Sequence, residues 1–146
     1  MAVAALVAWV ITALGGFVML ARWITNGGLR QQHAGPTRFP AGLVFGHFGL
    51  AAAGLVLWIA YLLADIDQLA WAAFVVLLPV ALLGFTMFAR WTGARRRAAV
   101  GVAAGGTGAA AGAEPAEQAL PVPVVVAHGV FAVATVVLVL LAALSA

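Results

Sequence analysis

The chain has 146 residues, of which 66% are hydrophobic and only 8% are charged, and its formal net charge is +3. Soluble domains carry about 25% charged residues, so this composition excludes an ordinary soluble domain and predicts a membrane protein. The sequence contains no cysteine, which excludes disulfides, thiolate metal sites, iron–sulfur clusters and covalently attached haem.

Four apolar segments are each long enough to cross a bilayer, which takes roughly 20 helical residues. They predict helices over residues 3–25, 39–64, 69–91 and 120–145. The acidic turn between the middle two is very short. Residues 93–119 are rich in glycine and alanine, bury little, and are predicted to form a flexible loop. The predicted fold is an all-α membrane protein, a single transmembrane domain over residues 1–146 with four helices in an up-down bundle.

The arginines predict the orientation of this bundle. All seven basic residues are arginines, and each lies in or beside one of the two longer connections. The positive-inside rule therefore places both arginine-rich loops in the cytoplasm and both termini outside. No basic residue precedes the first apolar run, so this run is predicted to be a retained helix rather than a signal peptide. The lack of lysine and the excess of alanine, glycine and valine indicate GC-rich bacterial coding, and hence a bacterial plasma membrane.

The sequence also contains an internal repeat. Residues 13–23 align without gaps on residues 81–91, and eight of these eleven positions are identical. A second element repeats after them, from Pro40 to His47 and from Pro121 to His128, with a connection that is thirteen residues longer in the second copy. The chain is therefore predicted to consist of two tandem two-helix hairpins that run in the same direction. In a simple bundle, the two histidine-bearing helices then lie on one diagonal.

His47 and His128 are the strongest site candidates. Ionisable residues inside a membrane are costly, and they mark functional sites by default. Each histidine lies seven residues after its proline, about 10 Å into the helix, so the two share one depth. Two imidazoles on opposed helices can supply both axial nitrogens of a haem iron. His47 and His128 are therefore predicted to ligate one haem b near the cytoplasmic leaflet.

Arginines and small residues near the histidines suit a haem as well. Arginine forms bidentate contacts with carboxylates, so Arg22 and Arg90, at the predicted cytoplasmic helix ends, are candidates for binding the two propionates. A porphyrin also needs space between helices, which glycines supply. The glycine candidates flank the histidines or lie near their level on the other diagonal: Gly16, Gly84, Gly46, Gly49 and Gly129.

With these features the chain resembles the membrane b-type cytochromes, which include the cytochrome b561-like proteins and the anchor subunits of quinone-linked dehydrogenases. The resemblance implies electron exchange between haem b and either quinone or a respiratory partner, within a larger respiratory or dehydrogenase complex. Cytochrome b561-like proteins carry more histidines and usually two haems. The single intramembrane pair in this chain implies one haem.

Plainer interpretations of these residues stay open. Each histidine would then form a hydrogen bond with a backbone carbonyl, and the glycines would allow close helix packing. Arg22 and Arg90 would contact lipid headgroups. The chain would then be a haem-free accessory subunit of a membrane complex. A small transporter is a weaker alternative, because broken helices and intramembrane charges are missing.

Other function classes lack support in the sequence. It contains no Ser/His/Asp set, no HExxH motif and no phosphate loop, so the chain by itself is not predicted to be an enzyme, although it suits a subunit of an oxidoreductase complex. No basic stripe with interleaved aromatic residues occurs, and nucleic acid is not an expected partner.

Overall fold

The computed structural model describes residues 1–33, 37–103 and 114–146. Four α-helices make up most of this part of the chain, which contains no strand: α1 (Ala2–Thr25), α2 (Ala41–Ala64), α3 (Asp67–Ala103) and α4 (Val122–Leu144). Two short 3₁₀-helices, η1 (Arg30–Gln32) and η2 (Ala116–Ala119), lie in the two longer connections. The predicted all-α fold is confirmed.

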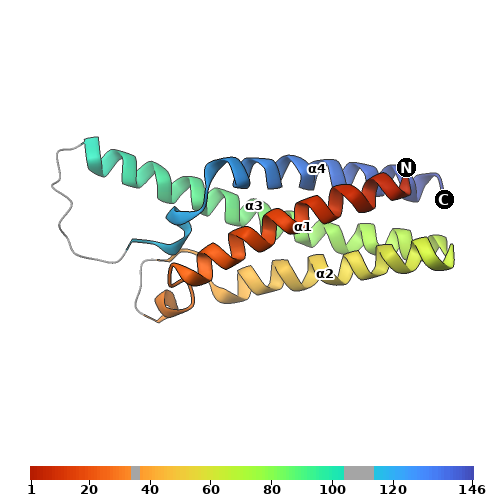
Figure 1. Ribbon diagram of the computed structural model, residues 1–146, viewed down its shortest axis with the longest axis horizontal. Helices are drawn as coiled ribbons and strands as arrows, with labels where there is room; N and C mark the ends of the chain where they lie inside the picture. The colour runs from red at the N-terminus through yellow and green to blue at the C-terminus, as the bar shows by residue number, and fades with distance from the viewer. Residues whose placement is uncertain (34–36, 104–113) are drawn as a thin grey trace.

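All four α-helices are long and apolar enough to cross a membrane. Their outward faces expose large apolar side chains such as Leu14, Val56, Leu82 and Val133, as contact with lipid requires. Figure 1 shows the helices side by side, with both termini and the α2–α3 turn at one end and both longer connections at the other. We call these the terminal end and the loop end. The chain is a multi-pass membrane protein.

The helices pack in a definite order around the bundle. α1 packs most closely against α4, and α2 against α3, while the α1–α2 and α3–α4 junctions are looser. The diagonals are therefore α1 with α3 and α2 with α4, as predicted. Each close pair joins one helix from each repeat, so the two repeats are interlocked and neither hairpin has a core of its own.

Two differences from the sequence prediction concern residues 93–119. The helix predicted to end at Trp91 continues to Ala103, because the alanines and arginines that make up most of its extension are good helix formers and outweigh Gly93 and Gly101. Residues 93–103 are thus helical, and the predicted flexible loop is wrong there. Near the other end of the connection, η2 is also ordered. The remainder of the predicted loop, residues 104–113, lies outside the described residues.

Local chemistry fixes the helix ends. Asp65 ends α2 in the left-handed conformation, with φ of 54°, which Asp tolerates better than most residues because its short side chain can bond locally. The two histidine-bearing helices begin immediately after Pro40 and Pro121. At the start of α2, the side-chain oxygen of Gln32 accepts the Ala41 backbone N–H at 2.8 Å and so satisfies a free helix donor.

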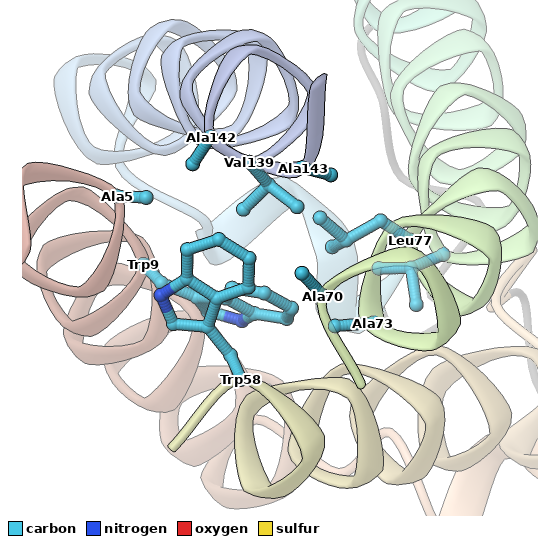
Figure 2. Close-up of a cluster of buried hydrophobic side chains, with 10 residues drawn as sticks. Ala5, Trp9, Trp58, Ala70, Ala73, Leu77, Val139, Ala142 and Ala143 are labelled. Atoms are coloured by element: carbon cyan, nitrogen blue, oxygen red, sulfur yellow. The ribbon is translucent and has the colours of Figure 1, made fainter. Parts of the chain in front are cut away.

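The interior of the terminal end is filled by two indoles of the first repeat. Trp9 and Trp58 are 3% and 0% exposed. Figure 2 shows their rings together at the centre of the bundle, with small residues of α3 and α4 opposite them. Large residues of one repeat are thus complemented by small residues of the other, which gives close packing. We call this group the terminal-end cluster: Ala5, Trp9, Trp58, Ala70, Ala73, Leu77, Val80, Val139, Ala142 and Ala143.

The interior of the loop end is covered by the two connections. Glu117 of η2 is fully buried, and its carboxylate accepts hydrogen bonds from the Thr37 hydroxyl and the Arg38 backbone N–H, both at 2.7 Å. Gln31 forms a second link, because its side chain donates to the Glu114 carbonyl and accepts from the Ala116 N–H. These bonds hold η1 and η2 over the loop-end cluster: Trp23, Phe39, Val44, Trp91, Ala116 and Leu120.

Candidate functional site

The two intramembrane histidines make equivalent hydrogen bonds. Nδ1 of His47 lies 3.0 Å from the Val80 carbonyl oxygen on α3, and Nδ1 of His128 lies 2.9 Å from the Thr12 carbonyl oxygen on α1. Thr12 and Val80 occupy the same position of the repeat, one residue before the aligned blocks. Each histidine therefore bonds the first helix of the opposite repeat.

Glycine makes these carbonyls accessible. In an α-helix the carbonyl of residue i points toward residue i+4, whose Cβ leans back over it. The residue four positions after Thr12 is Gly16, and the residue four positions after Val80 is Gly84. A Cβ at either glycine would lie 3.3 Å from Cε1 of the bonded imidazole. Gly16 and Gly84 thus admit the imidazoles themselves.

These bonds determine where each imidazole carries its proton. A carbonyl oxygen only accepts hydrogen bonds, so Nδ1 must be the protonated nitrogen in His47 and in His128. In a neutral ring the lone pair then lies on Nε2, which is the arrangement of a metal-binding histidine whose other nitrogen donates to a carbonyl. Both histidines are therefore prepared to act as ligands through Nε2.

The two imidazoles are also close enough to share one metal ion. Their ring centroids lie 6.3 Å apart, with an angle of 60° between the ring planes. A metal bonded to one nitrogen of each ring at about 2.0–2.1 Å places two centroids about 6 Å apart. The donor set, the protonation and the spacing therefore fit a haem iron, whose porphyrin supplies the remaining four nitrogens.

No larger group of ligands replaces this pair. Within the described ranges, three or more His, Cys, Asp or Glu side chains nowhere come together in a way that would hold a metal ion. His33 is exposed, at the end of η1 and away from the membrane helices. An ion at His47 and His128 would thus need ligands other than the His, Cys, Asp and Glu side chains of the described residues, and the porphyrin of a haem would supply such ligands.

The other glycine candidates are not part of the histidine contacts. A Cβ added at Gly46, Gly49 or Gly129 would meet no atom within 4 Å, so the backbone is open on that side of each residue. These open positions agree with the predicted room for a ring edge, although they would equally admit lipid. Their role in binding stays a prediction.

The arginine candidates lie at the loop end with exposed side chains. Arg90 donates from Nη1 to the Arg38 carbonyl oxygen at 2.8 Å and so ties α3 to the first connection. Arg22 is exposed at the corresponding position of α1. Neither guanidinium lies in the bundle interior, and no sequence pattern predicts the contact between Arg90 and Arg38.

The surroundings of the two histidines differ on the terminal side. The Thr12 hydroxyl lies 3.3 Å from the Thr135 hydroxyl, which adds a polar contact next to the carbonyl that His128 uses. The equivalent positions in the other half are Val80 and Gly54. A Cβ at Gly54 would lie 3.0 Å from the Trp9 ring, so this space is filled by an indole. His128 therefore has a more polar neighbourhood than His47.

Comparisons with known proteins add no relative. Neither protein-family models, nor the curated proteins, nor the solved structures contain a match to this chain. The assignment of a function consequently depends on the geometry of the site itself.

Proposed function

We propose that this protein is a membrane electron-transfer subunit that binds one haem b between His47 and His128. The observation that carries the proposal is the matched pair of Nδ1–carbonyl hydrogen bonds, which leaves Nε2 of both imidazoles free in rings 6.3 Å apart. A haem bound there supplies reversible one-electron chemistry. The protein supplies the two ligands, their orientation and an apolar surrounding.

The packing of the helices supports a defined position for the ring. His128 is bonded within the close pair of α1 and α4, and His47 within the close pair of α2 and α3. The ligands thus face the junction between the two pairs from opposite sides. A haem held by these two residues would lie in the junction between the two close pairs.

The distribution of charge supports an orientation. All seven arginines belong to the loop end or to its connections, so we infer that this end faces the cytoplasm of a bacterial plasma membrane. The haem would then lie nearer the cytoplasmic leaflet. A single haem at that depth is poorly placed to carry electrons across the whole membrane, so its partners would be quinone in the bilayer or further subunits of a respiratory or dehydrogenase complex.

One observation favours a second function. The carbonyls of Val80 and Thr12 already give each histidine a hydrogen-bond partner. A polar group satisfied in this way stabilises helix packing in a membrane without any cofactor. On this basis the protein would be a haem-free accessory subunit of a membrane complex, and its exposed apolar helix faces would contact lipid and other subunits.

An absorption spectrum separates the two functions. The protein, expressed in haem-replete cells and purified, is measured with and without dithionite. The haem proposal predicts a reduced b-type α-band that is lost in His47→Ala and in His128→Ala and retained in His33→Ala, the exposed histidine of the first connection. Folded, colourless wild-type protein would favour the accessory subunit.

A further inference from the structure

Two buried tryptophans of the loop-end cluster have unsatisfied donors. The side chains of Trp23 and Trp91 are 2% and 5% exposed. In the part of the chain that the structure describes, the indole Nε1 of each has no hydrogen-bond partner. Buried donors without partners are rare, because they lose their bonds to water without replacement. Both N–H groups therefore call for an acceptor that the described residues do not provide.

The two donors are equivalent by the internal repeat. Trp23 ends the first aligned block and Trp91 ends the second. Between them and the histidines, the interior is lined by further repeat-related pairs that are identical in the two halves: Met19 with Met87, and Val44 with Val125. An acceptor that suits this region is expected to have two equal acceptor groups on an apolar body.

At the terminal end the largest buried side chains do not match between the repeats. There the repeat-related positions of the largest side chains differ, because Trp9 corresponds to Leu77 and Trp58 to Val139. The two repeats have therefore diverged there in their largest buried side chains, although smaller ones such as Ala5 and Ala73 are identical. Large matched side chains such as the two tryptophans and the two methionines lie between the histidines and the loop end, which is where one two-fold-like ligand would contact both halves.

The backbones of the two tryptophans lie two helical turns from the histidine contacts, and the Trp23 indole packs against Gly28 of the first connection. Trp23 and Trp91 follow Gly16 and Gly84, which contact the imidazoles, by seven residues. Two helical turns of this length span about 10 Å along the axis. That is the order of distance that separates the iron of a haem from its two propionate carboxylates.

We propose that the indole N–H groups of Trp23 and Trp91 each donate a hydrogen bond to one propionate of the haem. This inference depends on the haem site proposed above. A carboxylate is a strong acceptor for a buried N–H donor, and one donor from each repeat matches one carboxylate on each side. Met19, Met87, Val44 and Val125 would contact the apolar body of the ring.

This assignment changes the role of the arginines. Adjacent residues of a helix point in different directions, so Arg22 and Arg90 do not face the interior that Trp23 and Trp91 occupy. Their exposed guanidinium groups would act on the propionates only through longer-range attraction, while the tryptophans make the direct contacts. Trp23 and Trp91 are in this sense positioning residues for the haem.

The test is a titration of the full-length protein in phospholipid nanodiscs with natural haem and with haem whose two propionates are methyl esters. Trp23→Phe and Trp91→Phe keep an aromatic ring but remove the N–H. Each is expected to bind natural haem about tenfold more weakly than wild type, since a hydrogen bond to a charged group is lost. The diester should show little of this loss. Each variant should also have a lower midpoint potential, because less of the propionate charge is compensated.

Trp58→Phe is the matched control, since it removes a buried indole N–H that donates to the Ala2 carbonyl in the terminal-end cluster. It should change the binding of both haems equally. Equal losses for natural haem and diester in Trp23→Phe and Trp91→Phe would overturn the inference while leaving the haem site intact. If neither variant folds, equal affinity of wild type for the two haems would overturn it. Wild type that binds neither haem would refute the proposed function as well.

Discussion

The carbonyl oxygen of Thr12 accepts a hydrogen bond from Nδ1 of His128, with 2.9 Å between the two atoms, and the two residues are 116 positions apart in the sequence. The bond joins the first and the last helix of the bundle, and its counterpart between Val80 and His47 joins the two middle helices. Both bonds cross from one repeat to the other. The histidines therefore hold the duplicated halves together and, at the same time, have their Nε2 atoms directed by that contact.

The glycines under the imidazoles provide the first prediction. Gly16→Ala and Gly84→Ala each introduce a Cβ 3.3 Å from a histidine ring, which must shift and weaken its bond to the carbonyl. We expect the free energy of unfolding of each variant to be about 1–3 kcal/mol lower than that of Gly93→Ala, which is the cost of a poorly satisfied buried donor. The melting temperature should fall accordingly. Gly93 is a suitable control because its added Cβ would meet no atom within 4 Å. Equal melting temperatures in the three variants would contradict this role of the glycines.

The second prediction concerns the buried carboxylate at the loop end. In Glu117→Gln one carboxylate oxygen becomes an NH2 donor, so the separate acceptors that the Thr37 hydroxyl and the Arg38 N–H now use, Oε2 and Oε1, cannot both be kept. The loss is expected to cost about 1–3 kcal/mol and to make the first connection more susceptible to limited proteolysis. Glu114 is exposed and lies in the second connection, as Glu117 does. Glu114→Gln should therefore leave the cleavage rate of the first connection unchanged.

The third prediction concerns the two arginines. If a haem is bound, replacing both Arg22 and Arg90 by Gln removes two cations from the loop end and should lower the midpoint potential. Because the side chains are exposed, salt screens their charge, and the shift should shrink at high ionic strength. A redox titration at two salt concentrations measures this. A potential that does not move in the double variant would rule out an electrostatic role for either residue.

The fourth prediction concerns orientation. The chain lacks cysteine, so single cysteines can be introduced and labelled without background. Ser145→Cys at the terminal end should react with a membrane-impermeant maleimide on intact cells, whereas Val100→Cys, at a position 68% exposed on the loop-end extension of α3, should react only after lysis. The opposite pattern would reverse the inferred orientation and place the histidines in the outer leaflet.

The C-terminal extension of α3 shows where local sequence patterns failed to predict the structure. Residues 93–103 lie next to a Gly-rich stretch and were predicted to be flexible with it, but their alanines and arginines favour a helix that α3 simply continues. The link between the connections could not be predicted either, because Glu117 has no partner in its own loop until Thr37 and Arg38 of the first connection lie beside it.

The sequence by itself determined the membrane class, the four spans, the repeat and the matching positions of His47 and His128 within it, because length, composition and internal identity do not depend on how the helices pack. Only the tertiary structure decided which groups these histidines bond and that Trp23 and Trp91 are buried without an acceptor. The physical reason is that the membrane helices are apolar on every side, so no polar face indicates how each is rotated in the bundle. That rotation is set by contacts between the repeats, such as an imidazole against a glycine, which neither segment specifies alone.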